Sequence, residues 1–221
     1  EFLQFGILLF AAGFLGTRAK QGLINDLHKT LIPLGAVALV AIIFVIGIQK
    51  DMGTGLAVLA ILGAMLVMAG LKFRAIGIVA AIGLALIVLM IIIAPHRVDR
   101  ITTFFQGDTT SLNDASNYHI VHAKIAIGSG GFLGVGIGNS VQATGYLPEA
   151  INDSVFAIMG ETFGFVGLVV ILLLFTALLM RLLAVAEHLE DIQLKLMLAG
   201  VFGWLGSHVY LHLAAMIGGF P

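Results

Sequence analysis

Six apolar runs account for most of the chain, and each is long enough, or nearly so, to cross a lipid bilayer. A membrane-crossing helix needs about 20 mainly apolar residues, because the hydrocarbon layer is about 30 Å thick and an α-helix rises about 1.5 Å per residue. The runs are Phe2–Thr17, Leu31–Ile48, Met52–Leu71, Ala75–Ala94, Val155–Leu183 and Leu196–Phe220. The sequence therefore predicts an all-α fold, a polytopic transmembrane helix bundle with about six spans.

The composition supports a membrane protein and excludes several other classes. Of the 221 residues, 60% are hydrophobic and 10% are charged, whereas a soluble domain carries about 25% charged residues. The formal net charge is −1, so we expect no basic surface for nucleic acid. The absence of Cys excludes thiol catalysis, iron–sulfur clusters and Cys-based zinc sites.

The loops between the runs differ in their content of Lys and Arg, which predicts the orientation of the chain in the membrane. Six consecutive crossings place seven Lys and Arg on one side and four on the other, and the richer side is expected to be cytoplasmic. The seven are Arg18, Lys20, Lys29, Lys72, Arg74, Arg181 and Lys195, and the four are Lys50, Arg97, Arg100 and Lys124. Residues 95–152, which form the one long loop, are then extracytoplasmic.

We expect residues 1–221 to form a single integral membrane domain, and we interpret the sequence as a fragment cut at both ends. The extracytoplasmic loop, residues 95–152, belongs to this domain. Its second half, Tyr118–Asn152, is too apolar for a disordered segment and is expected to pack on the helix bundle. Residues 120–127 fit a short helix at the membrane interface, with Lys124 reaching toward water.

The stretch Gly128–Ser140 has six glycines in its first eleven positions and allows two interpretations. Glycines let backbone N–H groups approach an anion, so the stretch could cradle a phosphate. The other interpretation is a tightly turned re-entrant loop whose glycines permit close helix contact. The stretch matches neither common phosphate-binding glycine motif, which favours the second interpretation, although a diphosphate resting on the amides is compatible with it.

Two carboxyl groups, Glu149 and Asp153, lie just before the fifth apolar run. In one interpretation Asp153 caps the following helix, where the helix dipole favours a carboxylate. In the other, Asp153 lies at the boundary of water and lipid and acts as a general base on a lipid-anchored substrate whose head group cannot leave that boundary. The two roles are compatible.

Glu161 lies inside an apolar run, where an ionised carboxylate costs about 2.5–3.5 kcal/mol. We therefore expect its side chain to face the bundle interior and to find a partner or a wet cavity. Glu1 and Asp51 lie near the outer ends of spans, and Lys124 and Arg100 offer positive charge. The spacing of these residues predicts a polar cluster but does not indicate its function.

His208 and His212 are four residues apart on the last run, a spacing that can ligate a metal. Residue 209 is Val rather than Glu, so the metalloprotease pattern fails. We interpret the two histidines as a polar helix-packing pair rather than a metal site.

The loop and its flanks resemble the SEDS family, the polytopic proteins of bacterial cell elongation and division that include RodA and FtsW. The most specific part runs from Tyr118 to Gly167. It comprises Lys124–Gly131, Gly134–Gln142, Tyr146–Glu149, Asp153, Phe156–Ile158 and Glu161. Gln49 with Asp51–Thr54 is similar to the family's Q-P-D-L-G-T hairpin, and Glu1 is similar to the Glu of its P-S-E-x-x-K motif. The sequence of Asn139–Gln142 is closer to the division branch, FtsW.

The resemblance implies ten spans, of which this chain would supply the fourth to the ninth. It implies an inverting peptidoglycan glycosyltransferase that polymerises lipid II at the outer face of the bacterial cytoplasmic membrane. Asp153 falls on the family's essential loop carboxylate and would be the catalytic base. Lys124, Arg100 and the glycine-rich turn would meet the leaving diphosphate. The full predicted substrate-binding set is Lys124, Ser129, Gly130, Glu149, Arg100, Glu1, Asp51 and Glu161.

The resemblance also implies partners, namely lipid II, a class B penicillin-binding protein and other divisome or elongasome membrane proteins. No cofactor is evident, and a need for a divalent cation is left open. The chain departs from the family at four positions. Gln4 stands where the family has Lys, and Thr162 where it has Glu. His208 and His212 stand where Gln and Asn are expected. Two other functions remain as alternatives: a lipid II flippase or transporter, and a non-catalytic scaffold for a transpeptidase.

Overall fold

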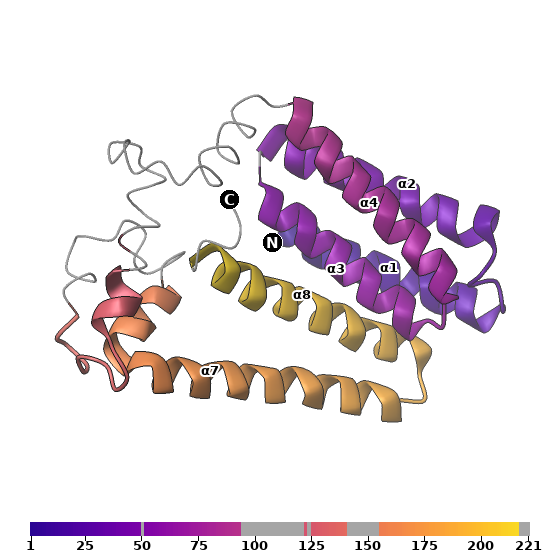
Figure 1. Cartoon of the computed structure of the whole chain (residues 1–221). Helices are drawn as coiled ribbons and strands as arrows, with labels where there is room; N and C mark the ends of the chain where they lie inside the picture. The colour runs from indigo at the N-terminus through magenta and orange to yellow at the C-terminus, as the bar shows by residue number, and fades with distance from the viewer. Residues whose placement is uncertain (50, 94–121, 123–124, 141–154, 217–221) are drawn as a thin grey trace. The chain divides into compact units, whose positions relative to one another are not determined.

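The computed structural model describes residues 1–49, 51–93, 122, 125–140 and 155–216, and it is helical throughout these ranges apart from turns and one loop (Figure 1). The elements are α1 (Phe2–Lys20), η1 (Leu27–Leu31), α2 (Ile32–Ile42), η2 (Ile43–Gln49), α3 (Met52–Met68), α4 (Phe73–Ile93), α7 (Val155–His188) and α8 (Ile192–Met216). The segments η1 and η2 are π-helical and continue α2 at both ends.

In the described part of the chain, a helical stretch occupies most of each of the six predicted apolar runs, which confirms the predicted polytopic helix bundle. Four helices in the described part of the chain are long and apolar enough to cross a membrane: Phe2–Lys20, Leu27–Val45, Val155–His188 and Ile192–Ala214. Gly53–Met68 and Arg74–Gly83 are shorter apolar helical stretches. The outward side chains are apolar as well, since Val40, Leu173 and Leu174 are each more than 60% exposed. Such a surface suits lipid rather than water.

The second helical stretch begins four residues earlier than predicted, because Asp26 caps it. The Asp26 carboxylate accepts hydrogen bonds from the backbone N–H groups of His28 and Lys29, both at 3.0 Å. These bonds satisfy donors that a helix start leaves unpaired. The bond from Lys29 is the main reason that the pKa of Asp26 lies below its usual value of 3.8.

The chain divides into two compact units. Unit 1 comprises Glu1–Pro95 and Leu179–His208, and unit 2 comprises His96–Leu178 and Val209–Pro221. In unit 1 the core includes five fully buried large apolar side chains from α1, α3 and α8. They are Leu8, Leu15, Ile61, Met65 and Leu196.

Small residues on α8 allow its close contact with α1 and α3 in unit 1. Gly200 faces the side chains of Leu8 and Met65, and a Cβ on Gly203 would lie 2.6 Å from the carbonyl oxygen of Ala60. Near the other end of α8, Gln193 contacts Gly16. The order of these contacts shows that α8 runs antiparallel to α1, as membrane helices with glycine interfaces often pack.

In unit 2, residues 125–129 are helical, which confirms part of the short helix expected near residues 120–127. The glycine-rich loop follows, and α7 begins at Val155. The sequence predicted one uninterrupted helix there, but Gly164 breaks it, with φ 69° and ψ −171°. Thr176 Oγ1 and Tyr210 Oη lie 3.1 Å apart and join α7 to the end of α8 within this unit. The rest of the predicted extracytoplasmic loop, residues 95–152, lies outside the described residues.

Candidate functional site

The glycine-rich loop binds to α7 at the point where α7 is broken. In an uninterrupted helix, the N–H groups of Phe165 and Val166 would bind the carbonyls of residues 161 and 162. Here Phe165 N–H donates to Gly131 O at 2.9 Å and Val166 N–H to Phe132 O at 3.2 Å.

The two carbonyls released by the break are also bonded. Val135 N–H donates to Glu161 O at 2.9 Å and Gly136 N–H to Thr162 O at 3.1 Å. The loop thus replaces the helical bonds that α7 gives up, so these backbone groups remain paired within an apolar environment.

Glycines make this backbone contact possible. A Cβ on Gly130 would overlap the carbonyl oxygen of Gly160, and one on Gly134 would overlap that of Thr162. A Cβ on Gly164 would overlap the backbone nitrogen of Gly134. The interpretation of a tightly turned loop with close helix contact is therefore confirmed.

The phosphate-cradle interpretation depends on backbone amides that point away from the protein. Four of the glycine N–H groups, those of Gly130, Gly131, Gly134 and Gly136, donate to backbone carbonyls of the preceding helical turn, of the loop or of α7. These four amides are engaged in holding the loop, and binding of a diphosphate by other amides of the stretch stays a prediction.

Glu161 is buried on α7, with 2% of its surface exposed, and Ser140 is also buried. The Ser140 hydroxyl donates a hydrogen bond to Glu161 Oε2. This confirms the expectation that Glu161 faces the interior and has a partner there. Sequence reasoning missed Ser140 as that partner, because nothing near position 140 indicates a contact 21 residues further along the chain.

Two other predicted site residues of unit 2 can be placed. The hydroxyl of Ser129 donates to Ala126 O at 2.9 Å, within its own helical turn. Gly130 is buried against α7. Their roles in substrate binding stay predictions. Asp153, Lys124, Glu149 and Arg100 lie outside the described residues.

In unit 1, Asp51 caps α3. Its carboxylate accepts hydrogen bonds from the backbone N–H of Thr54 at 3.0 Å and from the Thr54 hydroxyl. Burial raises the pKa of Asp51, but the hydrogen bonds from Thr54 and Gly53 and the charge on His208 together lower the pKa below its usual value of 3.8. Thr54 was missed, although an Asp followed three residues later by Thr at a helix start is a recognisable capping pattern.

His208 on α8 is hydrogen-bonded to α1 in the same unit, and its charge acts on Asp51. Its Nε2 lies 3.3 Å from Oε1 of Gln4, which is fully buried. Its ring also lies edge-on to Trp204, with ring centroids 6.4 Å apart. The interpretation of His208 as a polar packing residue is therefore confirmed. In the described part of the chain, Gln4 Nε2 has no hydrogen-bond partner.

Glu1 is exposed at the start of α1, where its backbone carbonyl accepts a bond from Phe5 N–H at 3.0 Å. Unit 1 therefore gathers Gln4, Asp51 and His208 near the starts of α1 and α3. Among the described residues there is no group of three or more His, Cys, Asp or Glu side chains that could hold a metal.

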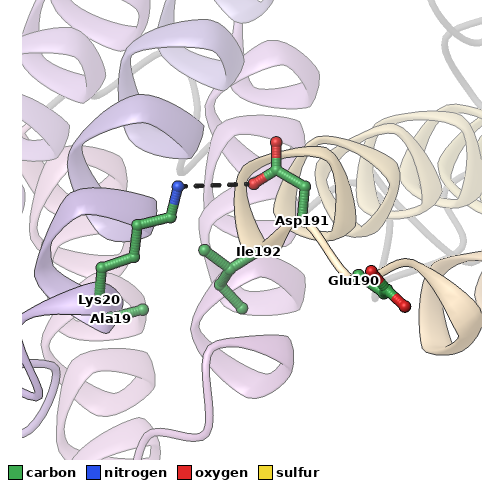
Figure 2. Close-up of a pocket in the computed structure, with 5 residues that line it drawn as sticks. All are labelled: Ala19, Lys20, Glu190, Asp191 and Ile192. Atoms are coloured by element: carbon green, nitrogen blue, oxygen red, sulfur yellow. Dashed lines mark ion pairs between the residues drawn. The ribbon is translucent and has the colours of Figure 1, made fainter.

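A cavity of about 610 Å³ lies at the other end of α1, between its last residues and the start of α8. Figure 2 shows Lys20 pointing toward Asp191, with 3.8 Å between Nζ and Oδ1, while Glu190 points away. Both partners of this ion pair are about half exposed, so the pair adds little stability. Of the predicted site residues that the structure describes, none lines this cavity.

Comparisons with known proteins identify the family. The FtsW/RodA/SpoVE family, described as cell cycle protein, matches residues 1–221. Stage V sporulation protein E of Bacillus subtilis is 30% identical over the whole chain, which covers 59% of that protein.

Two further relatives carry the name "Probable peptidoglycan glycosyltransferase FtsW". The protein from Thiomonas intermedia is 30% identical, and the whole chain covers 54% of its length. The protein from Halorhodospira halophila is 33% identical, and the whole chain covers 55% of its length. The chain thus spans about half the length of these relatives, and the similarity does not separate the FtsW and SpoVE branches. This polytopic membrane chain belongs to the FtsW/RodA/SpoVE family.

Proposed function

We propose that this chain is part of a peptidoglycan glycosyltransferase that polymerises lipid II at the outer face of the bacterial cytoplasmic membrane. The observation that carries the proposal is the family match over the entire chain, together with relatives named as probable peptidoglycan glycosyltransferases. A multi-pass helical fold suits a substrate whose polyprenyl tail stays in the bilayer.

In this proposal Asp153 is the general base. It precedes the start of α7 by two residues, and the partial positive charge of a helix N-terminus favours the ionised carboxylate, which is the form a base needs. Asp153 takes the proton of the acceptor sugar hydroxyl, and the hydroxyl oxygen bonds to the anomeric carbon of the donor. The bond from that carbon to the diphosphate oxygen breaks, and the diphosphate leaves with the electron pair. One displacement of this kind inverts the anomeric centre.

The leaving diphosphate is an anion, so it needs positive charge or N–H dipoles more than it needs a proton. We assign this role to Lys124 and Arg100, and to amides of the glycine-rich stretch other than the four that hold the loop. Glu149, Glu1 and Asp51 complete the proposed substrate-binding set. A class B penicillin-binding protein that cross-links the product is the proposed partner, and co-purification with the full-length protein tests it.

The test uses the full-length protein that contains this chain, purified in detergent and supplied with fluorescent lipid II. We expect glycan polymer from the wild type and at least about a hundredfold less from Asp153→Asn, because general base catalysis contributes about 10²–10⁴-fold. Asp191→Asn is the matched control, since Asp191 is a half-exposed carboxylate just before the start of α8. Translocation of lipid II in liposomes without polymer would instead support a flippase, and neither activity would support a scaffold.

A further inference from the structure

An apolar groove of about 370 Å³ lies between α2, α3 and α4 in unit 1 (Figure 1), and every residue that lines it is Leu, Ile, Val, Ala or Gly. Gly35 on α2 and Gly63 on α3 keep the groove wide, because a Cβ on either would meet nothing within 4 Å. Along α3 the lining runs from Leu56 to Leu66, which is about 15 Å. This length is about half the thickness of the hydrocarbon layer, so the groove fits an acyl chain from one leaflet.

Two connecting segments meet at one end of this groove. The backbone N–H of Lys72, in the turn between α3 and α4, donates to Asn25 Oδ1 at 3.1 Å. This bond holds the turn beside the loop that precedes η1. The carbonyl of Lys72 accepts from the N–H of Ile76, a groove residue, at 3.1 Å. Leu31 and Leu66 also line the groove at this end, which is therefore bordered by residues 25–30 and 69–74.

These two segments carry an excess of positive charge. Lys29, Lys72 and Arg74 are exposed, and none of the three forms an ion pair within the described residues. They stand against one carboxylate, Asp26, which is engaged in capping η1. The opposite end of the groove lies on the side of α3 that begins at the Asp51 cap, where a carboxylate would repel a phosphate. The charges thus give the groove a direction, with its anion-binding end at the α3–α4 turn.

We propose that this groove binds an anionic diacyl phospholipid, with one acyl chain along α3 and the phosphate among Lys29, Lys72 and Arg74. Basic pockets between membrane helices recognise anionic lipid head groups, and the apolar lining removes the acyl chain from competing contacts. The Lys and Arg content of the loops predicts that this end faces the cytoplasm, so the lipid belongs to the inner leaflet. The inference stands independently of the proposed glycosyltransferase activity.

Binding is measured on the full-length protein in detergent by native mass spectrometry. The probes are phosphatidylglycerol, which is anionic, and phosphatidylcholine with the same acyl chains, which is zwitterionic. We expect phosphatidylglycerol to bind at least about tenfold more tightly, because each Lys or Arg near a lipid phosphate contributes about fivefold. Equal affinities of the two lipids for the wild type would overturn the proposal.

Charge variants locate the head group. Lys72→Gln combined with Arg74→Gln should weaken phosphatidylglycerol binding about tenfold and leave phosphatidylcholine binding within about threefold. Arg181→Gln combined with Lys195→Gln is the matched control, since it removes the same charge from α7 and α8, outside the groove. An equal loss in both double variants would show attraction by net charge alone and would overturn the site.

Gly63→Leu tests the groove itself, because the new side chain would fill the space assigned to the acyl chain. We expect it to weaken phosphatidylglycerol binding about tenfold, whereas Gly13→Leu, which adds the same side chain at an unobstructed position on α1, should stay within about threefold. Wild-type affinity in a folded Gly63→Leu variant would overturn the placement of the chain. If that variant does not fold, the charge variants still decide, since they alter exposed side chains. Displacement of phosphatidylglycerol by an equimolar polyprenyl diphosphate would assign the groove to that lipid instead and overturn the proposal.

Discussion

Gln4 on α1 and His208 on α8 are hydrogen-bonded, with 3.3 Å between Gln4 Oε1 and His208 Nε2, although 204 positions separate them in the sequence. An amide oxygen only accepts, so this bond requires a hydrogen on His208 Nε2. The same bond leaves the Gln4 amide nitrogen buried with no partner in the described part of the chain. The pair therefore links two helices at the cost of one unsatisfied donor.

The Gln4–His208 bond should show coupling in a double-mutant cycle. Gln4→Leu and His208→Leu each remove this bond, and His208→Leu also leaves the fully buried Gln4 side chain without it, which costs about 1–3 kcal/mol. The double variant should be less destabilised than the sum of the two, by about 1 kcal/mol, because the Gln4–His208 bond is then lost only once. Unfolding of the full-length protein in mixed micelles measures these differences, and strict additivity would contradict the pairing.

Gly203 should be intolerant of a side chain, whereas another glycine in the same unit should accept one. Gly203→Ala places a Cβ 2.6 Å from the Ala60 carbonyl oxygen and 3.0 Å from Ile61 Cα, so α8 must shift away from α3. We expect a loss of about 1–3 kcal/mol in the same unfolding measurement. Gly13→Ala is the control: nothing lies within 4 Å of its added Cβ, and Ala favours the helix by up to about 1 kcal/mol.

Gly164 should be the most sensitive glycine of α7. Its φ of 69° with ψ of −171° is a conformation that only glycine adopts readily, and an added Cβ would overlap the loop backbone. We expect Gly164→Ala to release the loop and to cost about 2–4 kcal/mol. Gly128→Ala has open space around its Cβ and should not destabilise the protein in the same unfolding measurement.

Asp51 should make the stability of unit 1 depend on pH in the acidic range. Because the folded-state pKa of Asp51 is below 3.8, its contribution is fully present above that value and is lost as the pH falls through the folded-state pKa. Asp51→Ala should cost about 1 kcal/mol at pH 7, as the loss of a helix cap usually does.

The difference in stability between Asp51→Ala and the wild type is followed through their apparent unfolding midpoints, measured at several pH values between 7 and 3. We expect it to shrink toward the acidic end, while Glu190→Ala, the control at an exposed carboxylate that points away from the Lys20–Asp191 pair, shows no comparable change. A difference that grows on acidification would contradict the sign of the assigned pKa shift.

The helices could be predicted because length and apolarity alone define a membrane span. The third predicted run started at Met52, and so does α3. Apolarity does not reveal the start of the second helical stretch, because its Asp26 cap and its first turn lie in a polar stretch. Local rules thus determine helix positions and, with attention to capping residues, helix ends.

The break in α7 could not be predicted in the same way. Glycines are common in membrane helices, and Gly164 bends α7 only because Gly131–Gly136, about 30 residues earlier, supplies the donors and acceptors that the broken helix lacks. The burial of Glu161 followed from the cost of an exposed charge in lipid, but its partner did not. Ser140 becomes that partner through the path of the loop.

The exchange of backbone bonds between the loop and α7 has a consequence for biosynthesis. The ribosome makes residues 131–136 before it makes residues 161–166. The loop residues that bond the broken helix are therefore already translated when this helix emerges. The first turns of α7 therefore need no separate stage in which bare peptide groups face hydrocarbon, provided that both pieces leave the insertion machinery together.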